Sequence, residues 1–138
     1  MQRMLARAAA ILFLLSLLTG GLVSSAMRGA LPLDAGEILA AHLDGLMGCF
    51  LLLGVAWTLP MLRYGEAGRG RLAWAFIVPC YGNWAITALK SWLRVAGLGW
   101  TGEARNDAVF LLLAGCVVLP FLAAGAGWIA GLGGESHG

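Results

Sequence analysis

Charged side chains are scarce in this chain: they make up 12% of its 138 residues, whereas hydrophobic ones make up 60%. A soluble domain usually carries about a quarter charged residues, which form its polar shell. The mean hydropathy of +0.84 also indicates a membrane protein. The net charge of +2 is too small to suggest nucleic-acid binding, so we predict no nucleic-acid partner. The length predicts a single domain over residues 1–138.

Motifs of common soluble enzymes are also missing. The three cysteines, Cys49, Cys80 and Cys116, lie inside apolar runs and form no CxxC pair, so a zinc site is not expected. The sequence has no glycine-rich phosphate loop and no GxSxG motif. His42 is the only histidine outside the tail, so no Ser-His-Asp set is predicted within the membrane.

What the chain does have is four apolar runs, each long enough to cross a hydrocarbon core of about 30 Å. We predict transmembrane helices over residues 5–27, 37–62, 71–95 and 107–132, which together form an all-α integral membrane four-helix bundle. The first run also resembles a secretory signal, because Arg3 and Arg7 precede it and small residues follow it. Its apolar part is longer than a typical signal core, so we expect a retained helix. Residues 133–138 are expected to be disordered.

The distribution of basic residues predicts the orientation. Four spans place both termini on one side of the membrane. Arginines 3, 7, 63, 69 and 71 belong to the terminal side, and the other side has Arg28, Lys90, Arg94 and Arg105. Because cytoplasmic loops carry the excess of basic residues, we expect both termini in the cytoplasm, with the chain in a bacterial inner membrane.

His42 is the main candidate for chemistry, because polar residues inside a membrane are costly and often functional. Gly45 follows it at i+3 and Cys49 at i+7, with Gly48 a little to one side. One interpretation is close helix packing, with His42 hydrogen-bonded to a neighbouring helix. The other is a haem ligand beside a surface that Gly45 and Gly48 clear for a flat macrocycle, since histidine is a common axial ligand of haem.

The third predicted helix carries polar residues near its middle. Asn83 and Thr87 are spaced i, i+4 and share one face, so both can offer neutral hydrogen-bonding groups to an interior pocket. Tyr81 is a further candidate for the lining of that pocket. The alternative for these residues is hydrogen bonding between helices.

Two further polar sites have structural interpretations. Asp44 is two residues beyond His42 and points away from it, so we expect an ion pair with Lys90 or Arg94 of the third helix. Asn106 and Asp107 are expected to cap the fourth helix.

The second helix resembles that of the styrene oxide isomerases. The resemblance lies in Ala41-His42-Leu43-Asp44-Gly45, in Gly48, and in Thr58-Leu59-Pro60. It continues at Tyr81-Gly82-Asn83, where the family has a Trp-Ser-Asn-like triplet, and at Asp107, where the family has an Asp. It extends from about residue 41 to the end of the fourth helix.

The resemblance implies a small four-helix membrane protein that forms a homotrimer and holds haem b through His42, its metal ligand. It also implies that the iron acts as a Lewis acid on a lipophilic epoxide, which rearranges to a carbonyl compound without net redox. Two positions depart from the family. Gly48 replaces its pocket Asn and Thr87 replaces its pocket Tyr, so a larger or reshaped substrate cavity is expected.

Three functions are therefore compatible with the sequence. The first is a haem-b-dependent isomerase, with His42, Gly45 and Gly48 at the cofactor and Asn83, Thr87 and Tyr81 at the substrate. The second is a non-enzymatic haem protein for electron transfer, sensing or haem handling, with Met47, Met61 or a partner as second ligand. The third is an accessory membrane subunit without a cofactor. The expected partners are membrane lipid and a lipophilic small molecule.

Overall fold

The structure is a computed structural model that describes residues 1–133. In chain order it contains α1 (Gln2–Met27), α2 (Ala35–Thr58), the short 3-10 helix η1 (Leu59–Met61), α3 (Glu66–Leu93), α4 (Ala104–Leu113), the π-helical turn η2 (Ala114–Val118) and α5 (Leu119–Leu132). No strand occurs among residues 1–133, so the predicted all-α class is confirmed. The disorder predicted for residues 134–138 lies outside the described residues.

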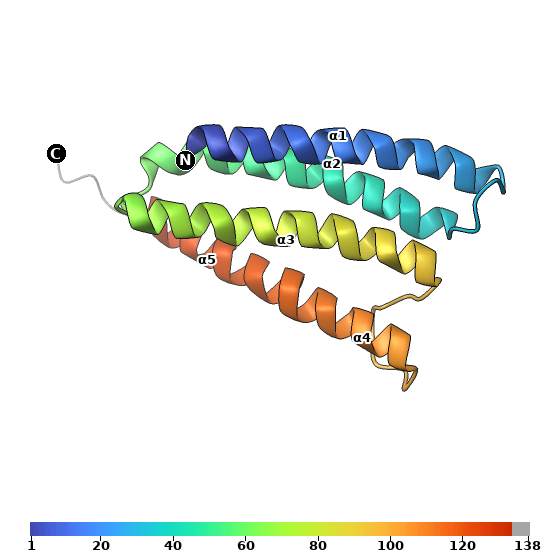
Figure 1. Ribbon diagram of the computed structural model, residues 1–138. Coiled ribbons are helices and arrows are strands. Elements are labelled where there is room, and N and C mark those ends of the chain that lie inside the picture. The colour runs from blue at the N-terminus through green and yellow to red at the C-terminus, as the bar shows by residue number, and fades with distance from the viewer. Residues whose placement is uncertain (134–138) are drawn as a thin grey trace.

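Four helical segments of the described chain are long and apolar enough to cross a membrane. They are α1, α2 with η1, α3, and the continuous run from α4 through η2 to α5. Figure 1 shows them side by side, with the N-terminus and the end of α5 at the same end of the bundle. This arrangement confirms the predicted four-helix integral membrane fold.

All four spans begin earlier than predicted. Helices α1, α2, α3 and α4 start at Gln2, Ala35, Glu66 and Ala104 rather than at residues 5, 37, 71 and 107. The reason is that an apolar run marks only the part of a helix that contacts hydrocarbon. Polar first turns continue the same helix beyond it, and a pattern based on hydropathy leaves them out.

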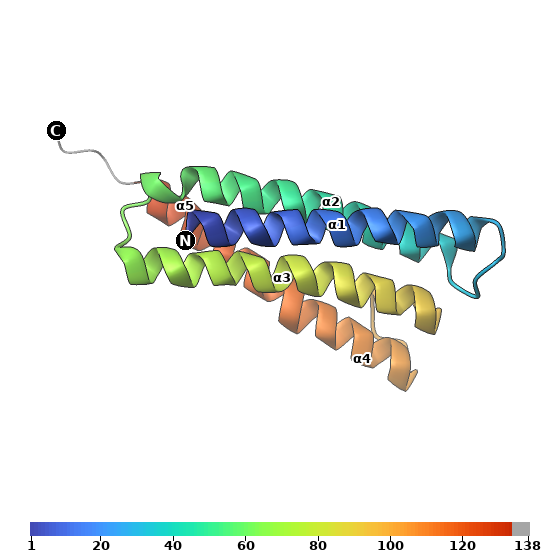
Figure 2. The same cartoon turned by 45° about the horizontal axis from the view of Figure 1, so that its top comes forward.

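The core of the bundle lies between α1, α2 and α3, with α5 packed on α3. Its fully buried side chains include Leu5, Leu12, Leu52 and Val55. Figure 2 shows α1 in front of the region between α2 and α3, and α4 diverging from the other helices. The outer faces of all four spans carry exposed large hydrophobic side chains, which suits contact with lipid or with another protomer.

The fourth span contains a π-helical turn that was not predicted from the sequence. Pro120 has no backbone N–H, so Cys116, four residues earlier, loses its usual helical hydrogen-bond donor, and the proline ring crowds that carbonyl. The turn at Ala114–Val118 widens the helix at this point. By contrast, α3 continues through Pro79 as one α-helix.

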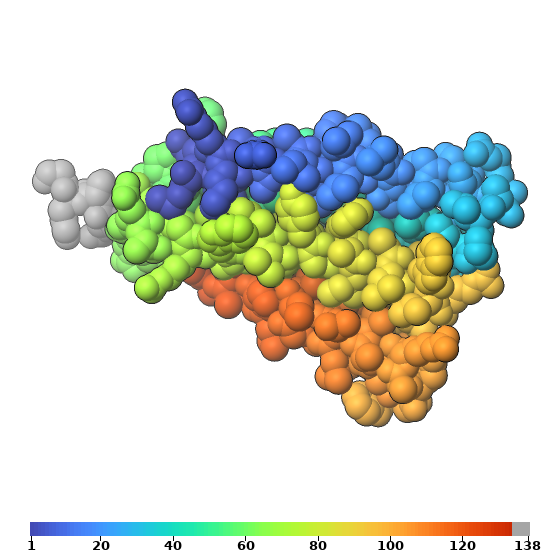
Figure 3. Space-filling model, viewed as in Figure 1, coloured from blue at the N-terminus to red at the C-terminus, as the bar shows by residue number. Residues whose placement is uncertain are grey.

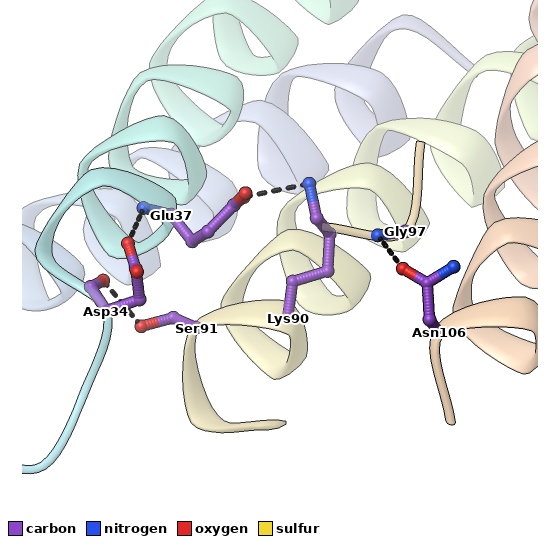
Figure 4. Close-up of polar contacts among 6 residues, drawn as sticks. All are labelled: Asp34, Glu37, Lys90, Ser91, Gly97 and Asn106. Carbon is purple, nitrogen blue, oxygen red and sulfur yellow. Dashed lines mark hydrogen bonds and ion pairs between the residues drawn. The ribbon is translucent and has the colours of Figure 1, made fainter. Parts of the chain in front are cut away.

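Polar contacts join α2 to α3 at the end of the bundle opposite the termini (Figure 4). Asp34 caps α2, because its Oδ1 accepts a hydrogen bond of 3.0 Å from the backbone N–H of Glu37. The hydroxyl of Ser91 donates to the Asp34 carbonyl at 2.8 Å. Nζ of Lys90 lies 2.8 Å from Oε2 of Glu37. The two helices are thus tied together by charge and by hydrogen bonds.

The expectation that Asp44 pairs with Lys90 or Arg94 was wrong. Glu37 binds Lys90 instead, and this is the one ion pair within residues 1–133. The helices α2 and α3 run in opposite directions, so the last turns of α3 lie beside the first turn of α2, where Glu37 is found. Asp44 is two turns further into the membrane.

Asn106 and Asp107 do not cap the fourth helix, which begins after Glu103. Both bind the loop before it. Oδ1 of Asn106 accepts from the backbone N–H of Gly97 at 2.8 Å (Figure 4), and Asp107 accepts from the N–H groups of Thr101 and Gly102 at 2.8 and 3.0 Å. Because the helix starts three residues earlier than predicted, these side chains fold back over the loop and hold it in place.

Candidate functional site

His42 lies where α2 meets α1, with its ring partly exposed. Nδ1 of His42 lies 2.7 Å from the backbone oxygen of Ser16 on α1. A carbonyl oxygen can only accept a hydrogen bond, so Nδ1 carries the proton and donates it. In the neutral ring Nε2 is then the atom with a free lone pair. The geometry thus fixes the tautomer of a neutral imidazole that can bind a metal.

A second contact holds the same pair of helices together. The hydroxyl of Ser16 donates to the backbone oxygen of His42 at 2.5 Å, and Ser16 is fully buried. Ser16 and His42 therefore bond to each other in both directions, one through a side-chain hydroxyl and the other through a ring nitrogen. This reciprocal pair fixes the backbone of α2 against α1 at the level of the ring.

Gly20 provides the space that the His42 ring occupies. A Cβ atom at Gly20 would lie 3.1 Å from Cε1 of His42 and 3.2 Å from Nδ1. Contacts this short force a neighbouring group to move. Nε2 of His42 has no hydrogen-bond partner within residues 1–133. Arg69 Nε is the one buried side-chain nitrogen or oxygen of these residues that lacks a partner. Because Nε2 also lacks a partner, it is not among the buried atoms and is accessible.

The side chains around His42 suit a cofactor in which most of the metal's ligands belong to the cofactor itself. Among residues 1–133 no cluster of three or more His, Cys, Asp or Glu side chains could hold a bare metal ion. One accessible imidazole nitrogen, with its partner nitrogen bonded to a carbonyl, is the arrangement found for an axial haem ligand. The residues present therefore fit haem.

Gly45 and Gly48 agree with the first of the two interpretations, which is close helix packing. A Cβ at Gly45 would lie 2.8 Å from Cβ of Ser16, and one at Gly48 would lie 2.9 Å from Cδ2 of Leu12. Both positions thus face α1 at close range, and Gly45 also approaches Trp84 of α3. Their small size permits close packing of α2 between its neighbours, rather than clearing a surface for a macrocycle.

Asn83 and Thr87 face another part of the molecule. They line a cavity of about 460 Å³ between α2, α3 and the fourth span, together with Asp44 and Lys90. A second cavity of about 320 Å³ adjoins it and shares Asp44 and Asn83; Gly48 lies in its wall. The i, i+4 spacing thus places Asn83 and Thr87 in one pocket as predicted, with an intramembrane carboxylate beside them.

Tyr81 is not part of this pocket. Its hydroxyl donates to the backbone oxygen of Ala8 on α1 at 2.8 Å, and its ring lines a separate groove between α1 and α3. Two residues along a helix correspond to a turn of about 200°, so Tyr81 and Asn83 point to nearly opposite sides. The expectation that Tyr81 lines the substrate pocket was therefore wrong for a single protomer.

Within one protomer, the structure also separates His42 from Asn83 and Thr87. His42 contacts α1, whereas Asp44, two residues on, lies in the cavity with Asn83. The histidine and the polar pocket thus occupy different sides of α2.

Ser16 and Gly20, which support the histidine, were not predicted from the sequence. Ser16 lies in an apolar run with no polar neighbour, and serine in such a run more often bonds to its own helix. Gly20 belongs to a Gly-Gly pair whose second member, Gly21, has nothing within 4 Å of its Cβ position. No pattern in α1 alone marks these two positions, because their role depends on a residue of α2.

The fold and the site define the class of protein: a helical membrane protein that has, within residues 1–133, one accessible imidazole and a separate apolar pocket edged by polar groups. The chain belongs to the styrene oxide isomerase family, since the family model described as "Styrene oxide isomerase" matches residues 1–132. The suspected resemblance is confirmed, and it extends through α1 as well. No curated protein and no solved structure matches the chain. Family membership indicates an isomerase.

Proposed function

We propose that this protein is a haem-b-dependent membrane isomerase that converts a lipophilic epoxide into a carbonyl compound. The observation that carries the proposal is the hydrogen bond of 2.7 Å between Nδ1 of His42 and the Ser16 carbonyl, which leaves Nε2 free as a ligand. Family membership supports the isomerase part of the proposal. When bound, haem supplies a Lewis acid that draws electron density from the epoxide oxygen.

The residues of the chain have distinct tasks in this proposal. Ser16 and Gly20 fix the tautomer and position of the His42 ring. Asn83 and Thr87 orient the substrate, because their neutral side chains can hydrogen-bond to an oxygen without adding charge to the pocket. The apolar remainder of the cavity excludes water, which would otherwise open the epoxide to a diol. Isomerisation moves one hydrogen within the substrate, so no oxidant, reductant or water is needed.

Asp44 places carboxyl oxygens close to the substrate. It lines both cavities, next to Asn83 in each. Epoxide opening develops positive charge on carbon, and carboxyl oxygens within the pocket favour that charge. Aryl-substituted epoxides delocalise the same charge, so we propose them as substrates. Thr87, which is smaller than the family's Tyr, suits a bulkier example than styrene oxide.

The separation of His42 from Asn83 supports a homotrimer in which neighbouring protomers complete each site. In one protomer the two groups lie on different sides of α2. A rotational trimer makes three equal interfaces, each joining one side of a protomer to a different side of the next. We propose that His42 of one protomer serves the Asn83 pocket of its neighbour. The exposed apolar residues Met47, Phe50 and Trp57 on α2 provide surface for such contacts.

Electron transfer is less well supported by the geometry. Met61 is 19 positions beyond His42, or about 28 Å along the axis of a continuous helix, too far for one haem. Met47 is five positions on, which corresponds to about 140° around α2. Neither sulfur can therefore serve as second axial ligand in the same protomer. An isomerase needs that position open.

The distribution of arginines supports the proposed orientation, with both termini in the cytoplasm of a bacterial inner membrane. A cysteine-accessibility assay at Ser25→Cys, near the end of α1, tests this orientation. Labelling from the periplasm alone would agree with termini in the cytoplasm, and labelling from the cytoplasm would contradict it.

Co-expression of two inactive chains tests the shared site. One chain carries His42→Ala and the other Asn83→Leu, each with its own affinity tag for isolating mixed oligomers. In every mixed trimer one of the three interfaces joins an intact histidine to an intact pocket, so activity should return to about a third of wild type. A mixed oligomer with no activity would contradict the shared site.

A labelled epoxide tests the reaction itself. Styrene oxide and a bulkier aryl epoxide, each with deuterium on the carbon that gives up its hydrogen, are incubated with the haem-loaded protein. We expect a carbonyl product that retains the deuterium, because the migrating atom never leaves the substrate. A diol, or loss of the label to solvent, contradicts an internal shift.

A further inference from the structure

The structure has a third cavity, unconnected with the proposed reaction, between α1 and α3. It measures about 690 Å³ and is lined along most of its length by apolar side chains. Two arginines, Arg3 and Arg7, lie at one end. Tyr81 forms part of the other end, where its hydroxyl binds the Ala8 carbonyl. Figure 3 looks onto this face, with α1 in blue above and α3 in green and yellow below.

The arginines lie where a lipid headgroup would be. Arg3 and Arg7 belong to the first two turns of α1, next to the end of the bundle at which the chain begins (Figure 1). Trp74, exposed on α3, lines the same end of the groove. Tryptophan is enriched at the boundary between hydrocarbon and headgroups. The groove therefore runs from the headgroup level down into the hydrocarbon layer, over about 12 Å between Arg3 and Ile11.

The charge at this end has no counterpart in the described chain. Neither Arg3 nor Arg7 forms an ion pair within residues 1–133. Arg63, Arg69 and Arg71 lie at the same end, and Glu66 is the one carboxylate there among the described residues. Arg69 is already bound to the carbonyls of Pro60 and Leu62, so it stabilises a loop. The two groove arginines are left to attract an anion from outside.

We infer that this groove binds a phospholipid with an anionic headgroup, from the leaflet on the side of the chain termini. Arg3 and Arg7 would bind the phosphate, and an acyl chain would lie along Ile77 and Val78. Charge complementarity decides between occupants. At this end a second copy of this chain would bring, among residues 1–133, Glu66 as the one carboxylate against five arginines, and a neutral lipophilic substrate would leave Arg3 and Arg7 without a counter-ion.

Binding of two matched lipids to the full chain tests the inference. The protein is reconstituted in nanodiscs or mild detergent, and retention of phosphatidylglycerol is compared with that of phosphatidylcholine with the same acyl chains. The test variant is Arg3→Gln with Arg7→Gln. The control is Arg63→Gln with Arg71→Gln, which removes the same charge at the same end but outside the groove. A third variant, Val78→Trp, fills the groove while keeping both arginines.

We expect the wild type to retain phosphatidylglycerol preferentially. The groove double variant should lose affinity for it by about 30-fold, the factor expected for two arginines in direct contact with the headgroup, and the control, whose arginines lie outside the groove, should change less than 3-fold. Val78→Trp should also weaken retention. Equal losses in both double variants would overturn the inference in favour of general surface charge, as would a wild type without preference. A Val78→Trp protein that keeps the lipid but has a smaller oligomeric mass would identify the groove as a protomer interface instead.

Discussion

Nδ1 of His42 donates a hydrogen bond of 2.7 Å to the backbone oxygen of Ser16, and this contact makes Nε2 the free nitrogen of the ring. The acceptor is a main-chain atom, so substitution of Ser16 cannot remove it directly. The space beside the ring is easier to change. Two adjacent glycines of α1 differ sharply in what surrounds them, and they provide a matched pair of variants.

Gly20→Ala should weaken haem binding, whereas Gly21→Ala should not. The new methyl group at Gly20 would lie 3.1 Å from Cε1 of His42, and nothing lies within 4 Å at Gly21. Overpacking of this kind costs about 1–3 kcal/mol, which corresponds to roughly a 5- to 150-fold loss of affinity if the ring alone moves. Haem titration followed by absorbance measures it. Equal affinities in the two variants would show that the ring is not confined by Gly20.

Asn83→Leu should reduce turnover by about 100-fold without changing haem content, because the lost amide orients the substrate and not the cofactor. Tyr81→Phe should leave turnover within about 3-fold of wild type, since that hydroxyl binds Ala8 on another side of α3. The measurement is epoxide conversion per bound haem. A large loss of turnover in Tyr81→Phe would show that Tyr81 does contribute to the substrate site.

Glu37→Gln should destabilise the bundle by about 3 kcal/mol, at the lower end of the range for breaking a buried ion pair. The Lys90 side chain is only 6% exposed and would lose its counter-ion, while the Glu37 side chain is 25% exposed. Thermal unfolding in detergent gives the change. Glu66→Gln, at an exposed position in the first turn of α3, is the control and should shift stability by less than about 0.5 kcal/mol.

Asp107→Ala should open the loop before α4. The carboxylate accepts hydrogen bonds from the N–H groups of Thr101 and Gly102, and hydrogen bonds to a charged acceptor are stronger than those between neutral groups. Hydrogen exchange at those two amides should accelerate at least about 10-fold. Asp107→Asn keeps one acceptor oxygen and should have a smaller effect. Unchanged exchange in Asp107→Ala would mean that the loop is held by Asn106 alone.

Hydropathy was sufficient to predict the number of spans, because a hydrocarbon core requires long apolar helices whatever their partners. Hydropathy was not sufficient to predict which side chains pair with each other. Asp44 and Lys90 lie at similar depths in the membrane, yet α2 and α3 pack in antiparallel fashion so that Lys90 forms its ion pair with Glu37. Choosing among partners at similar depth needs the rotation of each helix about its axis, which a single sequence does not specify.

At the candidate site, too, the features that depend on a single helix were predictable and those that depend on contacts between helices were not. The i, i+4 spacing was enough to place Asn83 and Thr87 in one pocket, since it depends on one helix alone. Tyr81 was expected there as a further polar residue near the middle of the third helix, but it lies two positions from Asn83 and therefore points to another side of α3. Ser16 could not be found at all, because its importance comes from a contact between α1 and α2. Properties of one helix were predictable, and properties of helix pairs were not.

Haem ligation by His42 is the central claim, and an absorption spectrum tests it most directly. The wild-type protein is purified in mild detergent, supplied with haem, and compared with His42→Ala and with His137→Ala, which removes the other histidine of the chain. We predict a Soret band in the wild type and in His137→Ala, and its loss in His42→Ala. A band that persists in His42→Ala, or a wild type that stays colourless after haem is added, would contradict the claim.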